Sequence, residues 1–330
     1  MNYNKIVQGI LDIGEAMLQS GAENFRLEDS FYRMCRSYGF KRSDVFVIPS
    51  NIQVTVETPE GEIITQIRHI ESSEPNFDQL DYLNNLCRYV CQHTPDENEM
   101  REKYLEVINR EPQKRITRYA AGIMGGTGFA VFFGCNLRDA VIAFIVSVMI
   151  VAVGDWLAKR ESNLLVYNGI LAFISEVIII GALKMGIAEH PDRIMIGIVM
   201  LLISGLSTTN GIRDLLQRDF ISGFINIMNS FLGAAGIAFG IGLAIILFHE
   251  GYSDHFILNH SVPIQLLSCT VACTGFALWF KIRGKQVWYN SIGAFFTWAI
   301  YVAVYAVKPS NFLATMIAAG FVGFYAFIMS

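Results

Sequence analysis

The chain has 330 residues, of which 53% are hydrophobic and 16% are charged, and its mean hydropathy is +0.40. A soluble domain usually carries about 25% charged residues, so part of this chain is depleted of charge. The net charge of -4 gives no indication of a nucleic acid partner. The depletion is confined to residues 119–330, a series of apolar segments, whereas residues 1–118 have the composition of a soluble domain.

The first part of the chain shows helical periodicity, then β-branched segments, then helical periodicity again. Ile6, Ile10, Ile13 and Met17 follow the spacing of an amphipathic helix, which the glycine of "QSGA" ends. The remaining elements are expected as a helix at 23–38, strands at 44–50, 51–58 and 62–70, and helices at 77–93 and 96–110. This order predicts an α+β domain over residues 1–116.

No catalytic motif occurs in this domain. It lacks a G-x-S-x-G elbow, a phosphate-binding glycine loop and a metal-spaced histidine pair, and His69 and His93 are interpreted as solvated side chains. Arg26 can form an ion pair with Glu23 on one helix face.

The six cysteines include two pairs at a spacing of four residues, which suits one helix face better than a disulfide. They are interpreted as buried thiols in a reducing compartment, without metal or cofactor: Cys35, Cys87, Cys91, Cys135, Cys269 and Cys273.

Apolar windows predict an α-helical polytopic membrane protein with about eight transmembrane helices. The windows are 117–134, 138–157, 165–187, 192–209, 220–248, 262–280, 286–307 and 311–329. Loops on the side of the first domain carry seven basic residues and the opposite loops carry four. The excess of positive charge predicts that the N-terminal domain is cytoplasmic.

Small and polar residues inside these windows predict packing and function. Gly122 with Gly126, and Gly236 with Gly240, have the spacing that lets helices approach closely in lipid. "GGTG" at 125–128 has no preceding strand and no following lysine, so packing is its expected use. Glu176 lies in the middle of a span, where a carboxylate costs about 2.5–3.5 kcal/mol. It is either a proton-carrying or substrate-facing group, or a carboxyl bonded to a neighbouring helix. Asp155 is expected to pair with Lys159, four residues further on.

The predicted external loop "HEGYSDHFILNH" contains several metal-ligand residue types. Their spacing fits no compact metal motif, so no metal site is predicted. The residues are His249, Glu250, Asp254, His255 and His260.

The stretch "ISGLSTTNGIRDLLQRDFISG" at 203–223 interrupts the fourth window. The apolar run Ile194–Leu206 has 13 residues, roughly 20 Å of helix against a hydrocarbon core of roughly 30 Å. Ser207, Thr208, Thr209 and Asn210 follow it, and a short interrupted span of this kind is typical of a transporter binding site. Ser222, Asn226 and Asn229 share one helix face and provide a second polar wall, although a purely structural hairpin is the alternative.

Two motifs carry a resemblance to a known family. "GEAMLQSGAENFRLED" matches a first signature at Gly14, Leu18, Ser20, Gly21, Ala22, Leu27 and Glu28. A second signature matches at Gly205, Thr209, Asn210, Arg213, Asp214, Ser222 and Gly223. The chain therefore resembles the bacterial threonine/serine exporter family, whose members join a cytoplasmic domain to about ten membrane helices, sometimes split between two chains. Ser204 stands where the family usually has proline.

The resemblance implies a first membrane module over 117–250 and a partial second module of about three helices over 261–330. The expected function is proton-coupled export of threonine, serine or similar small hydrophilic metabolites from a bacterial inner membrane. The expected partners are the lipid bilayer and a small-molecule substrate, with a homo-oligomer or a second membrane chain as further alternatives.

The working model assigns substrate binding to Ser207, Thr208, Thr209, Asn210, Asn226 and Asn229. Arg213 and Asp214 form an inner gate, and Glu176 carries the proton. Three alternatives stay open: export of dicarboxylates such as succinate, a membrane-anchored enzyme or signalling module acting through residues 1–118, and a non-transporting scaffold.

Overall fold

The computed structural model describes the chain except for residues 1, 72, 162, 249–260 and 330. The described residues form thirteen helices and three strands. Their contacts divide them into two compact units, the first containing residues 1–112 and 205–229 and the second residues 113–204 and 230–330. Residues 205–229 therefore pack with the N-terminal domain, although they lie in the sequence of the first predicted membrane module.

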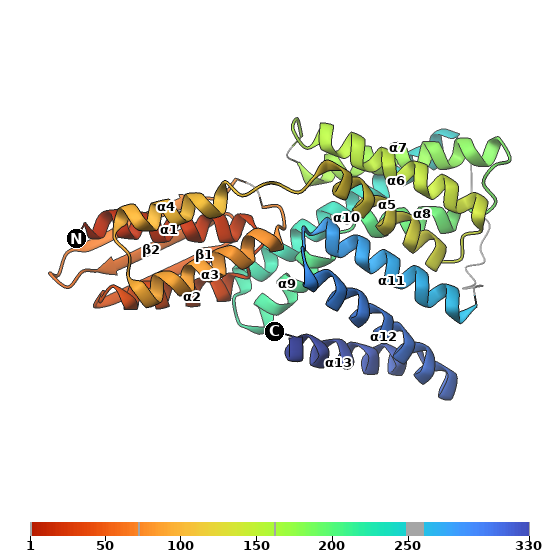
Figure 1. The fold of residues 1–330 in the computed structure, drawn as a ribbon. Coiled ribbons are helices and arrows are strands. Elements are labelled where there is room, and N and C mark those ends of the chain that lie inside the picture. Colours follow the sequence, from red (N-terminus) through yellow and green to blue (C-terminus); the bar gives the residue numbers. More distant parts are fainter. Residues whose placement is uncertain (1, 72, 162, 249–260, 330) are drawn as a thin grey trace. The chain divides into compact units, whose positions relative to one another are not determined.

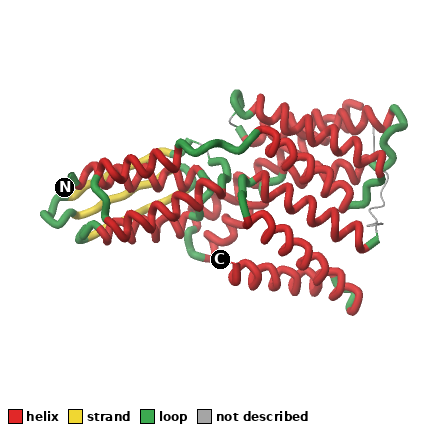
Figure 2. The backbone as a smooth tube through the Cα atoms, in the orientation of Figure 1, coloured by secondary structure: helices red, strands yellow, loops and turns green. Residues whose placement is uncertain are grey.

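The N-terminal part of the first unit has the predicted order of elements. The helices are α1 (Tyr3–Gln19), α2 (Asn24–Ser37), α3 (Phe77–His93) and α4 (Glu97–Ile108), and the strands are β1 (Arg42–Ile48), β2 (Asn51–Glu57) and β3 (Ile63–His69). All three strands lie in this part of the chain, and the other described elements are helices (Figure 2). This part of the chain therefore contains both helices and strands.

The three strands form an antiparallel sheet in the order β1-β2-β3. In β2 the side chains of Ile52, Val54 and Val56 are buried, and every second residue points to the same face. Helix α1 lies against β2 and β3, and α2 lies against β1, so these two helices cover the buried face (Figure 1). Helix α3 packs on α1 and α2, and α4 packs on α1 and α3, which completes the core.

A glycine of the first sequence motif allows α1 and α2 to approach closely. Gly14 lies in α1 and faces the ring of Phe31 in α2, and a Cβ atom at this position would overlap the ring. Phe31 is fully buried. Gly21 follows α1 with a φ angle of +89°, a left-handed conformation that favours glycine. The two glycines position the chain that leads into α2.

The second unit consists of helices. They are α5 (Arg115–Phe132), α6 (Leu137–Leu157), α7 (Leu164–Lys184), α8 (Pro191–Leu202), α11 (Val262–Trp279), α12 (Lys285–Val307), α13 (Asn311–Met329) and most of α10 (Phe220–Phe248). Helix α5 packs against α6, α8 and α11, which places it among its neighbours rather than at an edge.

Six described helices are long and apolar enough to cross a membrane: α6, α7, α10, α11, α12 and α13. The number rises to seven if α8 and α9 (Gly205–Leu216) together make one bent span. Helix α5 does not meet the same criterion, and its first turn carries Arg115 and Arg118. The architecture is that of a polytopic membrane protein, and the eighth span stays a prediction.

The predicted small-residue contacts are present. Gly122 and Gly126 of α5 lie against Val151 and Ser147 of α6, and a Cβ atom at either glycine would overlap the neighbouring side chain. Gly236 and Gly240 of α10 lie against the backbone of α7 in the same way. Gly128, within "GGTG", approaches the backbone of Ala272 in α11, so the expected use of this motif in packing is confirmed.

The expected pair of Asp155 with Lys159 is wrong. Helix α6 ends at Leu157, so the two residues do not share a helical face. Asp155 instead lies 2.8 Å from the guanidinium of Arg118 in α5. The neighbouring helix, rather than the local sequence, provides the counter-charge.

All six cysteines are free thiols. Cys35, Cys87 and Cys135 are buried as expected, and the other three are half-buried. Burial raises the pKa of Cys35 and that of Cys87 to about 12, so both are protonated at neutral pH.

Candidate functional site: a polar hairpin after a short membrane helix

A short helix and a break precede the polar stretch. Helix α8 has 12 residues, which is roughly 18 Å at about 1.5 Å per residue. It ends at Leu202, Ile203 is extended, and the chain bends by 55° before α9 begins at Gly205. The interruption therefore lies at residues 203 and 204, before Leu206, and the break forms without a proline. The freed carbonyl of Ser204 accepts a hydrogen bond from the Ser230 hydroxyl, at 3.3 Å.

Helix α9 and the first turns of α10 form a tight hairpin, which we call the polar hairpin (residues 205–229). Gly211 and Gly223 face each other, and the Cβ atom missing from Gly223 would lie 2.9 Å from the Gly211 carbonyl oxygen. Asp219 caps the start of α10 by accepting a bond from the Ser222 backbone N–H, at 3.2 Å. Arg218 adopts a left-handed conformation in the turn between the helices, with φ at 69°.

A buried carboxylate joins the two arms of the polar hairpin. Asp214 of α9 has only 4% of its surface exposed, and the Asn226 amide donates a hydrogen bond to it at 2.9 Å. A buried charge without such a partner is strongly unfavourable, so this bond favours the folded hairpin. Of the predicted site residues, Asp214 and Asn226 are brought into direct contact.

The other predicted substrate-binding residues lie on two different faces of α9. Ser207 and Asn210 are half-buried and share the face of Asp214, because residues three, four and seven positions apart lie together on a helix. Thr208 and Thr209 are exposed, and the Thr209 hydroxyl donates to the Gly205 carbonyl at 3.0 Å. Asn229 is exposed on α10. The predicted substrate-binding residues are thus divided between the inside and the outside of the hairpin.

Arg213 contacts a residue that the sequence analysis did not place in the site. Its guanidinium forms an ion pair with Glu23, the residue that precedes α2. Glu23 also pairs with Arg26 at 3.2 Å, as expected from their spacing. Arg213 and Asp214, assigned together to a gate, therefore contact different groups: Glu23 and Asn226.

Two further contacts join the first sequence motif to the second. The Glu28 carboxylate accepts a hydrogen bond from the Val47 backbone N–H at 3.2 Å, and the buried Ser222 hydroxyl lies 3.5 Å from the Val47 carbonyl oxygen. Both groups of this β1 residue therefore bond to side chains instead of another strand. One feature of the sequence pointed to these residues: Glu28 belongs to the first of the two motifs and Ser222 to the second.

The Glu28 carboxyl lies in an environment that disfavours its charge. Burial raises the pKa of Glu28 above its ordinary value, the Val47 hydrogen bond lowers it, and the negative charge of Asp219 raises it further. The net direction is upward, so the folded protein binds a proton at Glu28 more readily than the unfolded chain does.

Glu176 lies in the second unit, in the middle of α7, with 1% of its surface exposed. It lines a small cavity with Ser175, with α8 residues and with Ile241 of α10. The α8 residues belong to the turns before the break: Met195, Ile198, Val199 and Leu202.

The described residues contain no group of three or more His, Cys, Asp or Glu side chains that could hold a metal ion. The loop residues His249, Glu250, Asp254, His255 and His260, considered for a metal site, lie outside the described residues.

Comparison with known proteins decides the family. A model of threonine/serine exporters matches residues 8–248, most of the chain, and a second threonine/serine exporter model matches residues 265–330. The chain belongs to the threonine/serine exporter family. This is a family of transporters and not of enzymes.

A curated protein of Corynebacterium glutamicum, "Threonine/serine exporter", is 24% identical to this chain over an alignment of 245 residues, and the alignment covers 71% of the chain. The chain spans about half the length of that relative, because the match covers 50% of it. No solved structure matches the chain.

Proposed function

We propose that this chain exports small hydrophilic metabolites, with threonine and serine as substrates, in exchange for protons. The observation that carries the proposal is the polar hairpin, which follows directly on a 12-residue apolar helix in a member of this exporter family. An interrupted helix exposes backbone groups and polar side chains at membrane depth, which is how many secondary transporters bind their substrates.

The charge of the hairpin supports an amino acid rather than a dicarboxylate as substrate. Asp214 and Asp219 lie in the hairpin with Arg213 and Arg218, and Glu23 pairs with Arg213. The three carboxylates exceed the two arginines by one negative charge, which disfavours a dianion such as succinate, whereas a zwitterionic amino acid presents an ammonium group to them. A membrane-anchored enzyme or signalling module has no support from the family, which consists of transporters.

The hydroxyls and amides of the hairpin are the proposed substrate ligands. Ser207, Thr208, Thr209, Asn210, Asn226 and Asn229 would donate to the substrate carboxylate and accept from its ammonium group. Arg213 and Asp214 would form the inner gate, with Glu23 and Asn226 as their partners in the closed state. Opening would then require both the ion pair and the hydrogen bond to break.

Glu176 is the proposed proton carrier. Its burial in α7 and the adjoining cavity support this role, since an intramembrane carboxyl can be neutral at one stage of the cycle and charged at another. The proposed location is the bacterial inner membrane, with the N-terminal domain in the cytoplasm. The proposed protein partner is a second copy of this chain or a second membrane chain.

Transport by the purified full chain in proteoliposomes tests this function. We expect wild-type vesicles loaded with labelled threonine to release it when a pH gradient is imposed, and vesicles loaded with succinate to release far less. We expect Asp214→Asn and Thr209→Ala to reduce threonine export about tenfold or more, the loss of one to two hydrogen bonds to a charged group.

Two matched variants serve as controls. Thr270→Ala is the control for Thr209→Ala. The Thr270 hydroxyl donates to the carbonyl four residues earlier, that of Leu266, at 2.7 Å, as the Thr209 hydroxyl does to that of Gly205, but Thr270 lies outside the hairpin. Asp29→Asn removes an exposed carboxylate from α2. Unchanged export in both hairpin variants would contradict the proposed site, and the absence of threonine release from wild-type vesicles would contradict the proposed function.

A further inference from the structure

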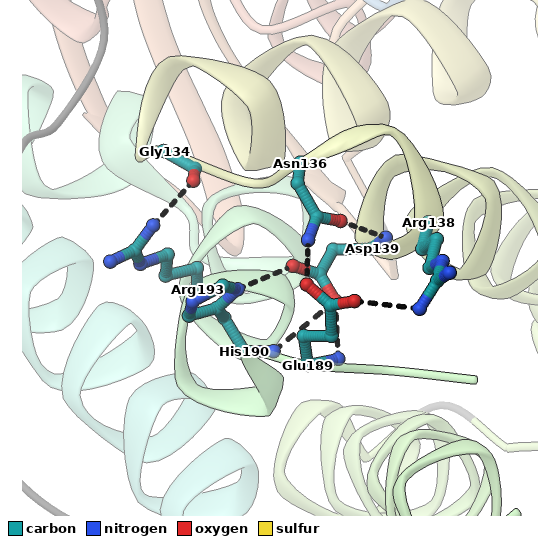
Figure 3. Close-up of polar contacts among 7 residues, drawn as sticks. All are labelled: Gly134, Asn136, Arg138, Asp139, Glu189, His190 and Arg193. Carbon is teal, nitrogen blue, oxygen red and sulfur yellow. Dashed lines mark hydrogen bonds and ion pairs between the residues drawn. The ribbon is translucent and has the colours of Figure 1, made fainter. Parts of the chain in front are cut away.

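A fully buried carboxylate lies in the second unit, away from Glu176, where the segment before α6 meets the segment before α8. Asp139 is in the first turn of α6 and none of its surface is exposed. Its Oδ1 atom accepts hydrogen bonds from the backbone N–H groups of Glu189 at 2.8 Å and His190 at 3.2 Å (Figure 3). Its Oδ2 atom lies 2.9 Å from Nδ1 of the His190 ring.

The other charged groups around this pair have partners of their own. Arg138 forms an ion pair with Glu189 at 2.8 Å, and Glu189 also accepts from the Asn136 amide. Arg193 donates to the Gly134 carbonyl at 2.6 Å. Figure 3 shows these contacts surrounding Asp139 and His190. Among the described residues, Asp192 and the Cys135 thiol also lie nearby.

His190 is the described side chain that both contacts the Asp139 carboxylate and can become positively charged. A buried carboxylate is unfavourable without a cation or several hydrogen bonds, and the His190 ring supplies one of these bonds beside the two backbone N–H groups. Glu189, Asp192, Arg138 and Arg193 are the charged groups nearest to this pair. A carboxylate bonded to one ring nitrogen also fixes the orientation of the ring, as in catalytic histidines.

The imidazole is accessible although its partner is not. The side chain of His190 is 38% exposed, whereas that of Asp139 is 0% exposed. Because Nδ1 faces the buried carboxylate, Nε2 is the ring nitrogen that does not contact Asp139. This nitrogen can take a proton from water while Nδ1–H stays bonded to Asp139.

Helix α8 links this pair to the cavity of Glu176. His190 is the residue that caps α8, and Met195, Ile198, Val199 and Leu202 further along α8 line the cavity. At about 1.5 Å per residue the two sites are separated by roughly 8–18 Å along the helix. A change of charge at the start of α8 therefore acts on the helix that borders the proposed proton carrier.

We propose that Asp139 and His190 form a proton-accepting dyad of this exporter. The inference rests on the proposed proton exchange. A proton from water binds Nε2, the ring becomes an imidazolium, and the Asp139 carboxylate stabilises its charge through Nδ1–H; release returns the proton from Nε2 to water or to the next acceptor. In the predicted orientation both segments lie on the outer side of the membrane, the side from which protons would enter.

Chemical labelling tests the dyad without any transport. Diethyl pyrocarbonate modifies the unprotonated imidazole, so mass spectrometry of the detergent-purified full chain reports the protonation of His190 at each pH between 5 and 8. We expect labelling of wild-type His190 to fall as the pH is lowered. In Asp139→Asn we expect the same fall at a more acidic pH, because the counter-charge is lost. An identical midpoint in both proteins would overturn the dyad.

Transport provides the second measurement. His190→Asn keeps an amide N–H near the position of Nδ1 but cannot be protonated. We expect it to retain exchange of threonine at equal pH on both sides and to lose proton-driven export about tenfold or more. His69→Asn, which replaces an exposed histidine of the first unit, is the matched control and should behave as the wild type does.

Proton-driven export by His190→Asn with the rate and pH profile of the wild type would overturn the dyad. If wild-type vesicles show neither proton-driven export of threonine nor exchange of threonine at equal pH, the proposed function is wrong. The labelling result still decides whether the dyad exists.

Discussion

At the scale of single residues, the charges of the first unit are arranged so that carboxylates outnumber the groups that neutralise them. Asp214 is satisfied by an amide and Glu23 by two arginines. Glu28 receives one backbone hydrogen bond and lies near the charge of Asp219. Burial, and to a smaller extent the charge of Asp219, raise the pKa of Glu28, which makes it one residue through which the stability of this unit depends on pH.

The sign of that dependence follows from the direction of the shift. Because the pKa of Glu28 is higher in the folded state, its contribution to stability is fully present below the ordinary carboxyl range and is lost as the pH rises through the folded value. We expect Glu28→Gln, which keeps an acceptor for the Val47 N–H, to reduce this loss of stability between acidic and neutral pH.

Thermal unfolding of the full chain in detergent between pH 4 and 8 would measure the effect. Glu102→Gln, at an exposed position of α4, is the control and should leave the pH dependence unchanged. A pH dependence in Glu28→Gln equal to that of the wild type would contradict the assignment.

At the scale of elements, glycines determine how closely the helices approach. Gly240 of α10 faces the backbone of α7, and an added Cβ atom would overlap the Gly169 carbonyl and lie 2.9 Å from the Phe173 nitrogen. Gly242, two residues further along the same helix, has open space around its missing side chain. Replacement by alanine changes helix propensity at both positions, but only at Gly240 does it also change the packing between helices.

We expect Gly240→Ala to destabilise the folded protein by about 1–3 kcal/mol, because the backbone of α7 cannot move aside as a flexible side chain would. Gly242→Ala should be neutral or stabilising by up to about 1 kcal/mol, the advantage of alanine over glycine in a helix. Reversible unfolding in mixed detergent micelles would provide both values. Equal effects at the two sites would refute the close contact.

At the scale of the whole molecule, two motifs almost two hundred residues apart in the sequence meet in one compact unit. Glu23 and Glu28 come from the first motif, and Arg213 and Ser222 from the second. The N-terminal domain therefore includes the polar hairpin in its own packing. This arrangement gives the domain a direct mechanical connection to the segment proposed to bind substrate.

The ion pair of Glu23 with Arg213 provides a measurable form of this connection. We expect a double-mutant cycle of Glu23→Ala and Arg213→Ala to show a coupling energy of about 0.2–1 kcal/mol, the range of partly exposed pairs. The control cycle uses Asp29 and Arg33, an ion pair within α2 that does not reach the hairpin. Its coupling should be about 0.3–0.5 kcal/mol in stability, with no effect on threonine export.

Threonine export should instead fall in Glu23→Ala and in Arg213→Ala, and the double variant should be no worse than the more impaired single variant. Additive losses in export would show that the two residues act independently of each other.

The sequence by itself determined the local structure of this chain. Periodicity located all seven elements of the N-terminal domain and a helix in each apolar window. The reason is that an element with one buried face, or a segment that is buried throughout, shows this in the spacing of its own apolar residues. The spacing of Gly122 with Gly126 and of Gly236 with Gly240 identified helix contacts for the same reason. The motifs also identified the family, which the comparisons established.

Only the tertiary structure decided which charged and polar groups meet. Asp155 pairs with Arg118 rather than Lys159, and Arg213 pairs with Glu23 rather than with its neighbour in the sequence. The dyad of Asp139 and His190 joins residues 51 positions apart. Such contacts depend on how separate helices pack against one another, whereas a spacing rule describes the residues of one helix only. The hydrophobic pattern specifies where each helix lies in the chain, whereas its neighbours specify the partner of each charge.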